Sequence, residues 1–127
     1  MKIINIEKLD GHKVIVITGR DENVRVIAKH LKAMLYYVPR ETDYFEDYPL
    51  VANELKETVD NMRHIDRVIA ITSQNAEFLD CLLQSELDFA LVTVRKDTKE
   101  EKLYRLRVVT KEDAWKNRCA FRFELRR

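Results

Sequence analysis

The sequence predicts a three-layer α/β fold, with a mostly parallel sheet, helices on both of its faces and an antiparallel strand at its edge. Two continuous apolar runs, at 14–17 and within 66–73, have the β-branched composition of strands that are covered on both faces. Each run leads into a segment with apolar residues at helical spacing. Strands that alternate with helices in this way form a parallel sheet, because each crossover helix must pack back onto the sheet.

The chain of 127 residues has the size of one domain, which we expect to span residues 1–127. Charged residues make up 35 % of the chain, and glycine and proline number two each, a composition typical of heat-stable proteins with short loops. A thermophilic source is therefore our hypothesis. No apolar run reaches the ~20 residues of a membrane span and no signal peptide is recognisable, which predicts a cytoplasmic protein without membrane contact.

The first part of the chain predicts a hairpin followed by a long helix. The two strands of the hairpin are residues 3–9 and 12–19, and Asp10-Gly11 between them is a strong turn signal. Asp21 can cap a helix that continues to Val38, just before a proline that ends it. The apolar stripe of this helix consists of Val24, Ile27, Ala28, Leu31, Met34 and Leu35.

The rest of the chain predicts helices at 50–62 and around 78–83, and strands at 66–73 and 89–95. Residues 102–109 alternate between charged and apolar side chains, which predicts a half-exposed antiparallel strand near an edge of the sheet. Thr110 and Asp113 resemble a capping box at the start of a short helix that carries Trp115.

Charged and aromatic side chains are unevenly distributed. Residues 41–60 hold seven acidic side chains and one basic one, whereas residues 102–127 hold nine basic and three acidic ones. This asymmetry fits head-to-tail contact between copies, an anionic partner, or two solvated faces. The segment 36–48 is rich in aromatic and acidic side chains but has no EF-hand spacing. Its aromatic residues either cover the core or form a partner surface.

Two strand ends provide the candidate ligand site. Ligands of open α/β sheets bind beyond the carboxyl ends of the parallel strands, where helix N-termini offer free N–H groups to an anion. The residues at the two ends are Thr18, Gly19, Arg20 and Asp21, and Thr72, Ser73, Gln74 and Asn75. The same residue types form helix caps and turns without any ligand, and this alternative stays open.

No catalytic or metal-binding set is recognisable in the sequence. His12, His30 and His64 do not lie four residues apart, so no helical pair of metal ligands exists. Cys81 falls on the apolar stripe of a helix, where a small core residue is expected rather than a nucleophile. We therefore expect no catalytic residue, no metal and no cofactor.

The order of motifs resembles that of RecF-like, ABC-type P-loop ATPases, an AAA-style group. The segment Gly19–Val26, GRDENVRV, takes the place of the Walker A motif G-x-x-x-x-G-K-[ST]. Val24, Arg25 and Val26 stand at the second glycine, the lysine and the hydroxyl residue. Valine stiffens the backbone and offers no hydroxyl to Mg²⁺, and arginine differs from lysine in reach and shape. The resemblance thus implies a degenerate nucleotide cradle, in which Arg25 keeps only the charge.

A later segment is more similar to the family. Residues 71–79, ITSQNAEFL, resemble its T-T-H-S-x-E-F-L switch, with Gln74 in place of the histidine that senses the γ-phosphate. Residues 89–115 resemble its terminal strand, turn, strand and helix. The Walker B strand, an apolar run that closes in Asp-Glu, has no counterpart, since no apolar run precedes Asp43 and Tyr44 falls where the catalytic Glu would be.

These features favour a non-catalytic P-loop ATPase-like domain that acts as a binding or regulatory module through protein contact. Members of the family work as dimers, so the resemblance implies a second copy or a related ATPase as the partner. One alternative is a weak nucleotide or phosphate binder with residual hydrolysis, with Arg20 or Arg25 on phosphate and Gln74 orienting water. Another is salt-sensitive nucleic-acid binding by the basic C-terminal segment, through Arg105, Arg107, Arg118, Arg122, Arg126 and Arg127.

Overall fold

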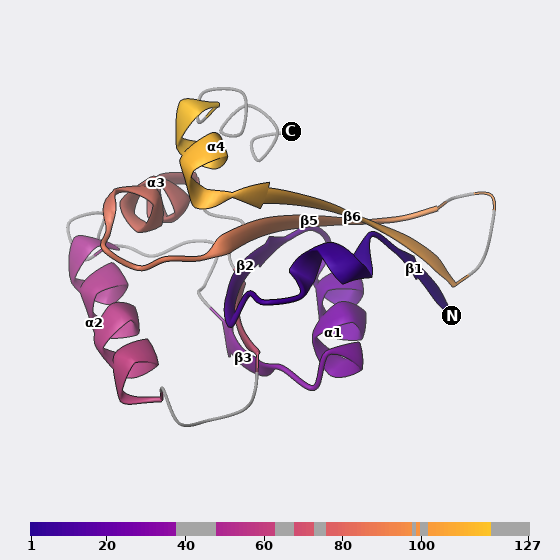
Figure 1. Ribbon diagram of the computed structural model, residues 1–127, viewed down its shortest axis with the longest axis horizontal. Helices are drawn as coiled ribbons and strands as arrows, with labels where there is room; N and C mark the ends of the chain where they lie inside the picture. The colour runs from indigo at the N-terminus through magenta and orange to yellow at the C-terminus, as the bar shows by residue number, and fades with distance from the viewer. Residues whose placement is uncertain (38–47, 63–67, 73–75, 98, 100–101, 118–127) are drawn as a thin grey trace.

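The computed structural model describes residues 1–37, 48–62, 68–72, 76–97, 99 and 102–117 (Figure 1). Its strands are β1 (Lys2–Ile4), β2 (Val14–Thr18), β3 (Met34–Tyr37), β4 (Ile69–Thr72), β5 (Ala90–Lys96) and β6 (Leu103–Thr110). Its helices are the 3-10 helix η1 (Ile6–Leu9), α1 (Asp21–His30), α2 (Tyr48–Asn61), α3 (Ala76–Gln84) and α4 (Lys111–Lys116).

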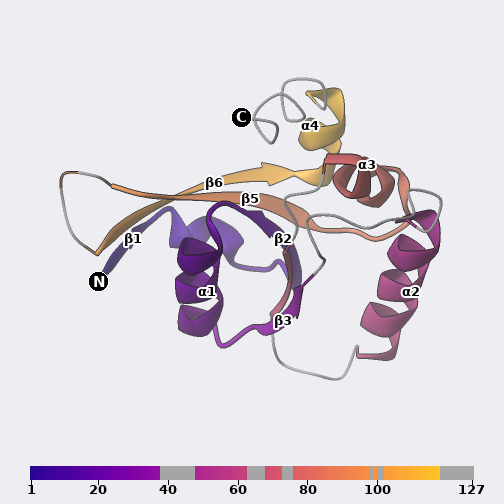
Figure 2. The ribbon, with the colours of Figure 1, turned by 180° about the vertical axis from the view of Figure 1, so that it is seen from behind.

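The six strands form one mixed sheet in the order β1-β6-β5-β2-β4-β3. The strands β3, β4, β2 and β5 are parallel neighbours, and β6 runs antiparallel to β5. One face of the sheet is covered by η1 and α1, and the other by α2, α3 and α4 (Figures 1 and 2). The expected three-layer, mostly parallel α/β architecture is thereby confirmed. The antiparallel strand is not at the edge as predicted, because β1 pairs with the outer side of β6.

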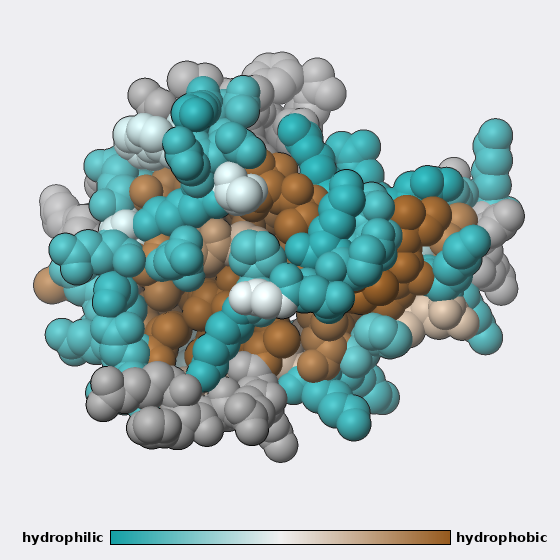
Figure 3. Space-filling view, in the orientation of Figure 1, coloured by the Kyte–Doolittle hydropathy of each residue, from teal (hydrophilic) through white to brown (hydrophobic). Residues whose placement is uncertain are grey.

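Each face of the sheet has its own apolar core. Successive side chains of a strand point to opposite faces, so Val16 packs with Phe78 and Leu82 on one side, while Ile17 packs with Ile27 on the other. All of β2 is buried, which explains its continuous apolar run. Figure 3 shows that hydrophobic residues still reach the molecular surface between charged side chains. They are visible in the centre of the view and along the arm formed by β1, β5 and β6.

The predicted hairpin of residues 3–9 and 12–19 is wrong. Strand β1 ends at Ile4 and pairs in parallel with β6, with Lys2 opposite Leu103. Asn5 adopts a left-handed backbone, with φ 72°, and its Nδ2 donates a hydrogen bond to the Leu106 carbonyl at 3.0 Å. The chain then forms η1 instead of extending, so the turn at Gly11 joins a 3-10 helix to β2 rather than two paired strands.

The predicted continuation of the first long helix to Val38 is also wrong, because α1 ends at His30. Lys32 takes the left-handed conformation, with φ 52°, that glycine usually supplies at a helix end. The N–H of Lys32 donates to the Lys29 carbonyl and that of Ala33 to the Ala28 carbonyl, the two bonds of a Schellman motif. The chain beyond this cap forms β3, which pairs with β4.

The predicted elements of the second half are confirmed as α2, β4, α3, β5, β6 and α4. The Thr110 hydroxyl caps α4 by accepting a hydrogen bond from the Asp113 N–H at 3.1 Å. The core of the acidic and aromatic segment, residues 38–47, and the basic tail, 118–127, lie outside the described residues. No helix in the described part of the chain combines the length and apolarity needed to cross a membrane.

A half-buried ammonium group joins α4 to the rest of the fold. Lys111 Nζ donates hydrogen bonds to the carbonyl of Ser85 at 2.5 Å and to that of Leu87 at 2.6 Å. The same atom lies 5.5 Å from the centroid of the Phe89 ring. Burial lowers the pKa of Lys111 below its usual range, and the charge of Asp88 opposes this shift. Lys111 therefore satisfies carbonyls that follow α3 and fixes α4 beside them.

We expect Lys111→Met to lower the free energy of unfolding by about 1–3 kcal/mol, because two half-buried carbonyls lose their donor. Because the folded-state pKa of Lys111 is lowered, the unfolded chain binds this proton more tightly than the folded chain does. The stability of the wild type relative to the variant therefore increases as the pH rises towards the unfolded-state pKa of about 10.4. Urea denaturation at pH 7 and pH 10 measures both effects. The exposed Lys116→Met is the control in the same helix, and an equal loss in both variants contradicts the assignment.

Candidate functional site

The carboxyl end of β2 is the topological switch point of the sheet, from which strands are added in opposite directions. The chain leaves β2 towards β3 on one side of the sheet, whereas β5 lies on the other side. Ligand crevices of open α/β sheets form at such a point. The two predicted strand ends, those of β2 and β4, do lie side by side, since Ile17 pairs with Thr72. Three of the candidate residues, Ser73, Gln74 and Asn75, lie outside the described residues.

Only two residues, Gly19 and Arg20, separate β2 from α1. The Arg20 carbonyl already accepts hydrogen bonds from the N–H groups of Asn23 and Val24, at 2.9 and 3.0 Å. Val24, Arg25 and Val26 are therefore helical residues, and the side chain of Arg25 is exposed to solvent. A connection this short leaves no loop between the Gly19 and Val24 positions that could wrap around a phosphate group.

The first turn of α1 carries negative charge of its own. Asp21 and Glu22 are both exposed there. Carboxylates at this end of a helix interact favourably with the partial positive charge of the helix dipole. They also repel an incoming anion. The partial positive charge at the N-terminus of α1, which the sequence analysis gave as an anion site, is therefore already offset by Asp21.

Gly19 is required by packing between strands. Its φ is +143°, a conformation that favours glycine. A Cβ atom at this position would lie 2.8 Å from the carbonyl oxygen and from Cγ1 of Val94 in β5. The glycine thus allows the end of β2 to approach β5 closely. This packing explains why glycine occupies position 19, and no bound ligand is needed to explain it.

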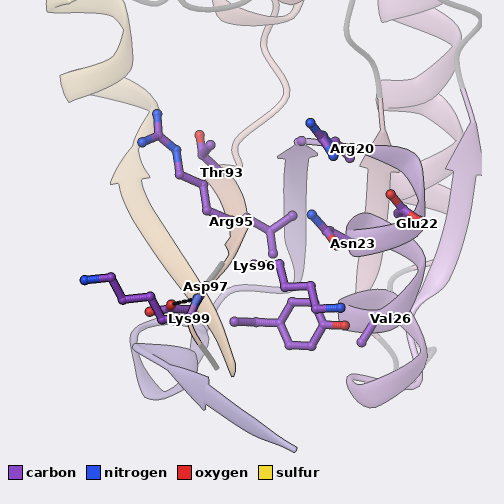
Figure 4. A pocket seen from close by; sticks show the side chains of 12 residues that line it. Arg20, Glu22, Asn23, Val26, Thr93, Arg95, Lys96, Asp97 and Lys99 are labelled. Carbon is purple, nitrogen blue, oxygen red and sulfur yellow. Dashed lines mark hydrogen bonds between the residues drawn. The ribbon is translucent and has the colours of Figure 1, made fainter. Parts of the chain in front are cut away.

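A crevice opens beside α1 because β5 and β6 are longer than β2. These strands have 7 and 8 residues, against 5 in β2, and β5 continues past Thr93, the partner of the last residue of β2. The crevice between α1 and this overhang has a volume of about 860 Å³. Its lining includes Arg20, Asn23 and Val26 before and along α1, and Val94, Lys96 and Tyr104 from the strands (Figure 4).

Two buried polar side chains in the crevice have no hydrogen-bond partner among the described residues. Asn23 is 8 % exposed and Tyr104 is 7 % exposed. Neither the amide of Asn23 nor the hydroxyl of Tyr104 forms a hydrogen bond within the described ranges. A buried polar group without a partner typically costs about 1–3 kcal/mol of stability.

The charged lining of the crevice is mostly basic. Four cationic side chains take part, from Arg20, Arg95, Lys96 and Lys99, against the carboxylates of Glu22 and Asp97. Asp97 Oδ2 lies 3.6 Å from Nε of Arg105, and its Oδ1 accepts the Lys99 N–H at 2.8 Å. The four cations form no ion pair with any other described residue. In Figure 4, Lys96 points towards α1, whereas Arg95 and Lys99 point away from it.

Sequence analysis identified Gly19 and Arg20 of this lining and missed Asn23, Lys96 and Tyr104. Asn23 gives no distinct sequence signal, because it is one of several polar residues in an amphipathic helix. Lys96 and Tyr104 face each other across the β5–β6 pair, a proximity that only the strand register reveals. The one signal available in the sequence was a polar residue, Asn23, one position before the apolar stripe of the helix.

Other candidate residues do not assemble into a site. Burial and the Asp80 charge raise the pKa of the Cys81 thiol, which disfavours a reactive thiolate. No three His, Cys, Asp or Glu side chains gather to hold a metal ion within the part of the chain that is described. Arg105 and Arg107 are exposed on β6, and the remaining arginines of the basic tail lie outside the described residues.

Comparison with protein-family models, with curated proteins and with solved structures finds no match for this chain.

The packing of Gly19 predicts unequal costs for two glycine substitutions. Gly19→Ala meets both an unfavourable φ and the 2.8 Å contacts with Val94, so we expect a loss of about 3 kcal/mol. Gly11→Ala has a φ of +85° but no atom within 4 Å, so we expect a loss of about 1 kcal/mol. Thermal and urea denaturation of both variants test this, and similar losses would show that the β2–β5 approach tolerates a side chain.

Proposed function

We propose that this chain is a non-hydrolysing P-loop ATPase-like domain that acts as a binding or regulatory module through contact with a protein partner. The observation that carries the proposal is the two-residue connection between β2 and α1. Phosphoryl transfer depends almost entirely on holding the phosphates and Mg²⁺ in place. A connection that can hold neither is compatible with a retained scaffold and a lost reaction.

The arrangement of the strands supports the likeness to the ATPase family. The strand that precedes the Walker A-like segment, β2, and the strand that leads into the switch-like segment, β4, are parallel neighbours. In an ATPase the two segments must meet, because the switch residue senses the phosphate that the Walker A segment holds.

The loss of hydrolysis rests on three side chains as well as on the turn. Val24 is buried in the core and Val26 lines the crevice, so neither position offers a hydroxyl or a flexible backbone to a nucleotide. Arg25 points to solvent from the second turn of α1. The carboxylates of the first turn oppose a triphosphate at the same place.

The outer edge of β3 is the surface that best fits a protein partner. Among the described residues, β3 pairs only with β4, so its other side presents backbone N–H and carbonyl groups. Leu35 lies on this strand with 41 % of its surface exposed. An open strand edge with an exposed apolar side chain is a template for pairing with another chain. A second copy can provide that chain through the same strand, in a two-fold symmetric contact.

Calorimetric titration with ATP and with ADP, each with and without Mg²⁺, tests the loss of the nucleotide site. We expect no Mg²⁺-dependent heat of binding at millimolar nucleotide, because the short connection between β2 and α1 leaves no phosphate cradle. Micromolar, Mg²⁺-dependent binding of ATP would contradict the proposal and favour the alternative of a residual ATPase.

Light scattering coupled to size-exclusion chromatography tests the β3 edge. We expect the wild type to form a dimer and Leu35→Lys to shift it to the monomer, since a charge on β3 opposes pairing. Leu50→Lys is the matched control, because Leu50 is 62 % exposed but lies on α2. A wild type that is monomeric at every concentration contradicts pairing between copies and leaves a different protein as the partner.

A further inference from the structure

We propose that the crevice between α1 and the β5–β6 overhang binds a small organic anion, with its charged group at Lys96 and its apolar body against Val26 and Val94. This site goes beyond the proposed partner contact, because β3 lies at one edge of the sheet and β5 and β6 lie towards the other. It also differs from a phosphate cradle, because the groups that would bind the anion are side chains from α1, β5 and β6 rather than the backbone N–H groups of a loop.

The unpartnered polar groups point to a ligand. Asn23 is more than nine-tenths buried and has no hydrogen-bond partner in the described chain, and Figure 4 shows its side chain directed into the crevice. Tyr104 lines the same crevice, equally buried and equally without a partner for its hydroxyl. An amide and a phenol can donate two hydrogen bonds to the oxygen atoms of one anionic group.

The position of Lys96 supplies the charge for that group. Lys96 and Tyr104 are directly opposite each other in the antiparallel register, so their side chains leave the same face of the sheet. Figure 4 shows Lys96 and Asn23 on the two sides of one gap, with Val26 beside them. Amide, phenol and ammonium therefore converge from α1, β6 and β5. Arg20 adds a second positive charge to the lining.

The remaining lining limits which anion fits. Val26 and Val94 provide apolar surface that an inorganic ion cannot use, and a volume of about 860 Å³ suits a molecule with a ring or a short chain. Glu22 and Asp97 place two carboxylates in the same lining, which disfavours a polyanion such as a nucleoside triphosphate. A compact phosphate monoester or carboxylate with an aromatic body meets these conditions.

Nuclear magnetic resonance titration of the full-length, ¹⁵N-labelled protein with phenyl phosphate tests the site. Inorganic phosphate and phenol serve as probes for the two halves of the ligand. We expect phenyl phosphate to shift the side-chain amide signals of Asn23 and the backbone signals of Lys96 and Tyr104, and to bind at least roughly tenfold more tightly than either half. Saturation by inorganic phosphate with the same affinity would reduce the site to an adventitious ion only and overturn the proposal.

Two variants separate a binding role from a structural one. Asn23→Leu replaces the unpartnered amide with an apolar group of similar size, so we expect a higher melting temperature together with at least a roughly tenfold loss of phenyl phosphate affinity. A purely structural Asn23 would give a lower melting temperature. Lys96→Met, at an exposed position, is expected to fold normally and to lose affinity by a similar factor. The control Lys116→Met removes one surface charge from α4 and should change the affinity by less than about twofold.

Three results overturn the proposal: no signal shifts at millimolar phenyl phosphate, wild-type affinity in a folded Asn23→Leu or Lys96→Met, or an equal loss in Lys116→Met. If Asn23→Leu does not fold, Lys96→Met and its control decide the question. These outcomes are independent of the nucleotide titration and of the oligomeric state, so either proposal can fail without the other.

Discussion

The burial of β2 between β4 and β5 is the constraint on which the rest of the structure depends. Every residue of β2 is buried, because helices cover both faces of the strand and a parallel neighbour lies on each side. Burial of the four apolar side chains Val14–Ile17, at roughly 1.5–3 kcal/mol each, makes β2 a central contribution to the cores on both faces of the sheet. Its end must then approach β5 closely, and the contact between Gly19 and Val94 is the result.

That close approach fixes what the site can and cannot do. Because the chain turns within two residues, α1 begins at once and no loop remains to enclose a phosphate. The same turn directs α1 against β5, and β5 and β6 continue beyond the end of the shorter β2. The crevice is therefore a geometric consequence of unequal strand lengths, and its lining extends from the N-terminus of α1 along the helix to Val26.

The sequence was informative wherever local periodicity coincides with tertiary structure. The apolar runs of β2 and β4 and the stripes of α2 and α3 could be predicted, because burial on one or both faces dictates their composition. The strand β3 could not, since Met34 and Leu35 continue the helical spacing of α1 and the cap uses Lys32 where glycine is usual. The partner of β1 could not either, because its pairing with β6 joins residues about a hundred positions apart.

The candidate site was harder to predict for the same reason. Arg20 and Gly19 were accessible from a general rule about strand ends, but the crevice requires the β5–β6 register, which brings Lys96 opposite Tyr104, and the orientation of α1, which directs Asn23 towards them. No pattern within a short stretch of sequence contains this information. Residues such as Asn23 have no local signature, because their importance lies in what surrounds them after folding.

A contrast between two polar side chains, half-buried Lys111 and buried Asn23, distinguishes a structural role from a binding role in this fold. Lys111 has two carbonyl acceptors and an aromatic face, so its N–H donors have partners within the protein and its role is complete without a ligand. Asn23 is more deeply buried and has no such partner in the described chain. Nothing in the packing of α1 requires an amide at that position, since an apolar side chain of the same size would avoid the cost of an unpaired polar group. The most direct physical explanation is that the partner of Asn23 is a molecule the protein binds.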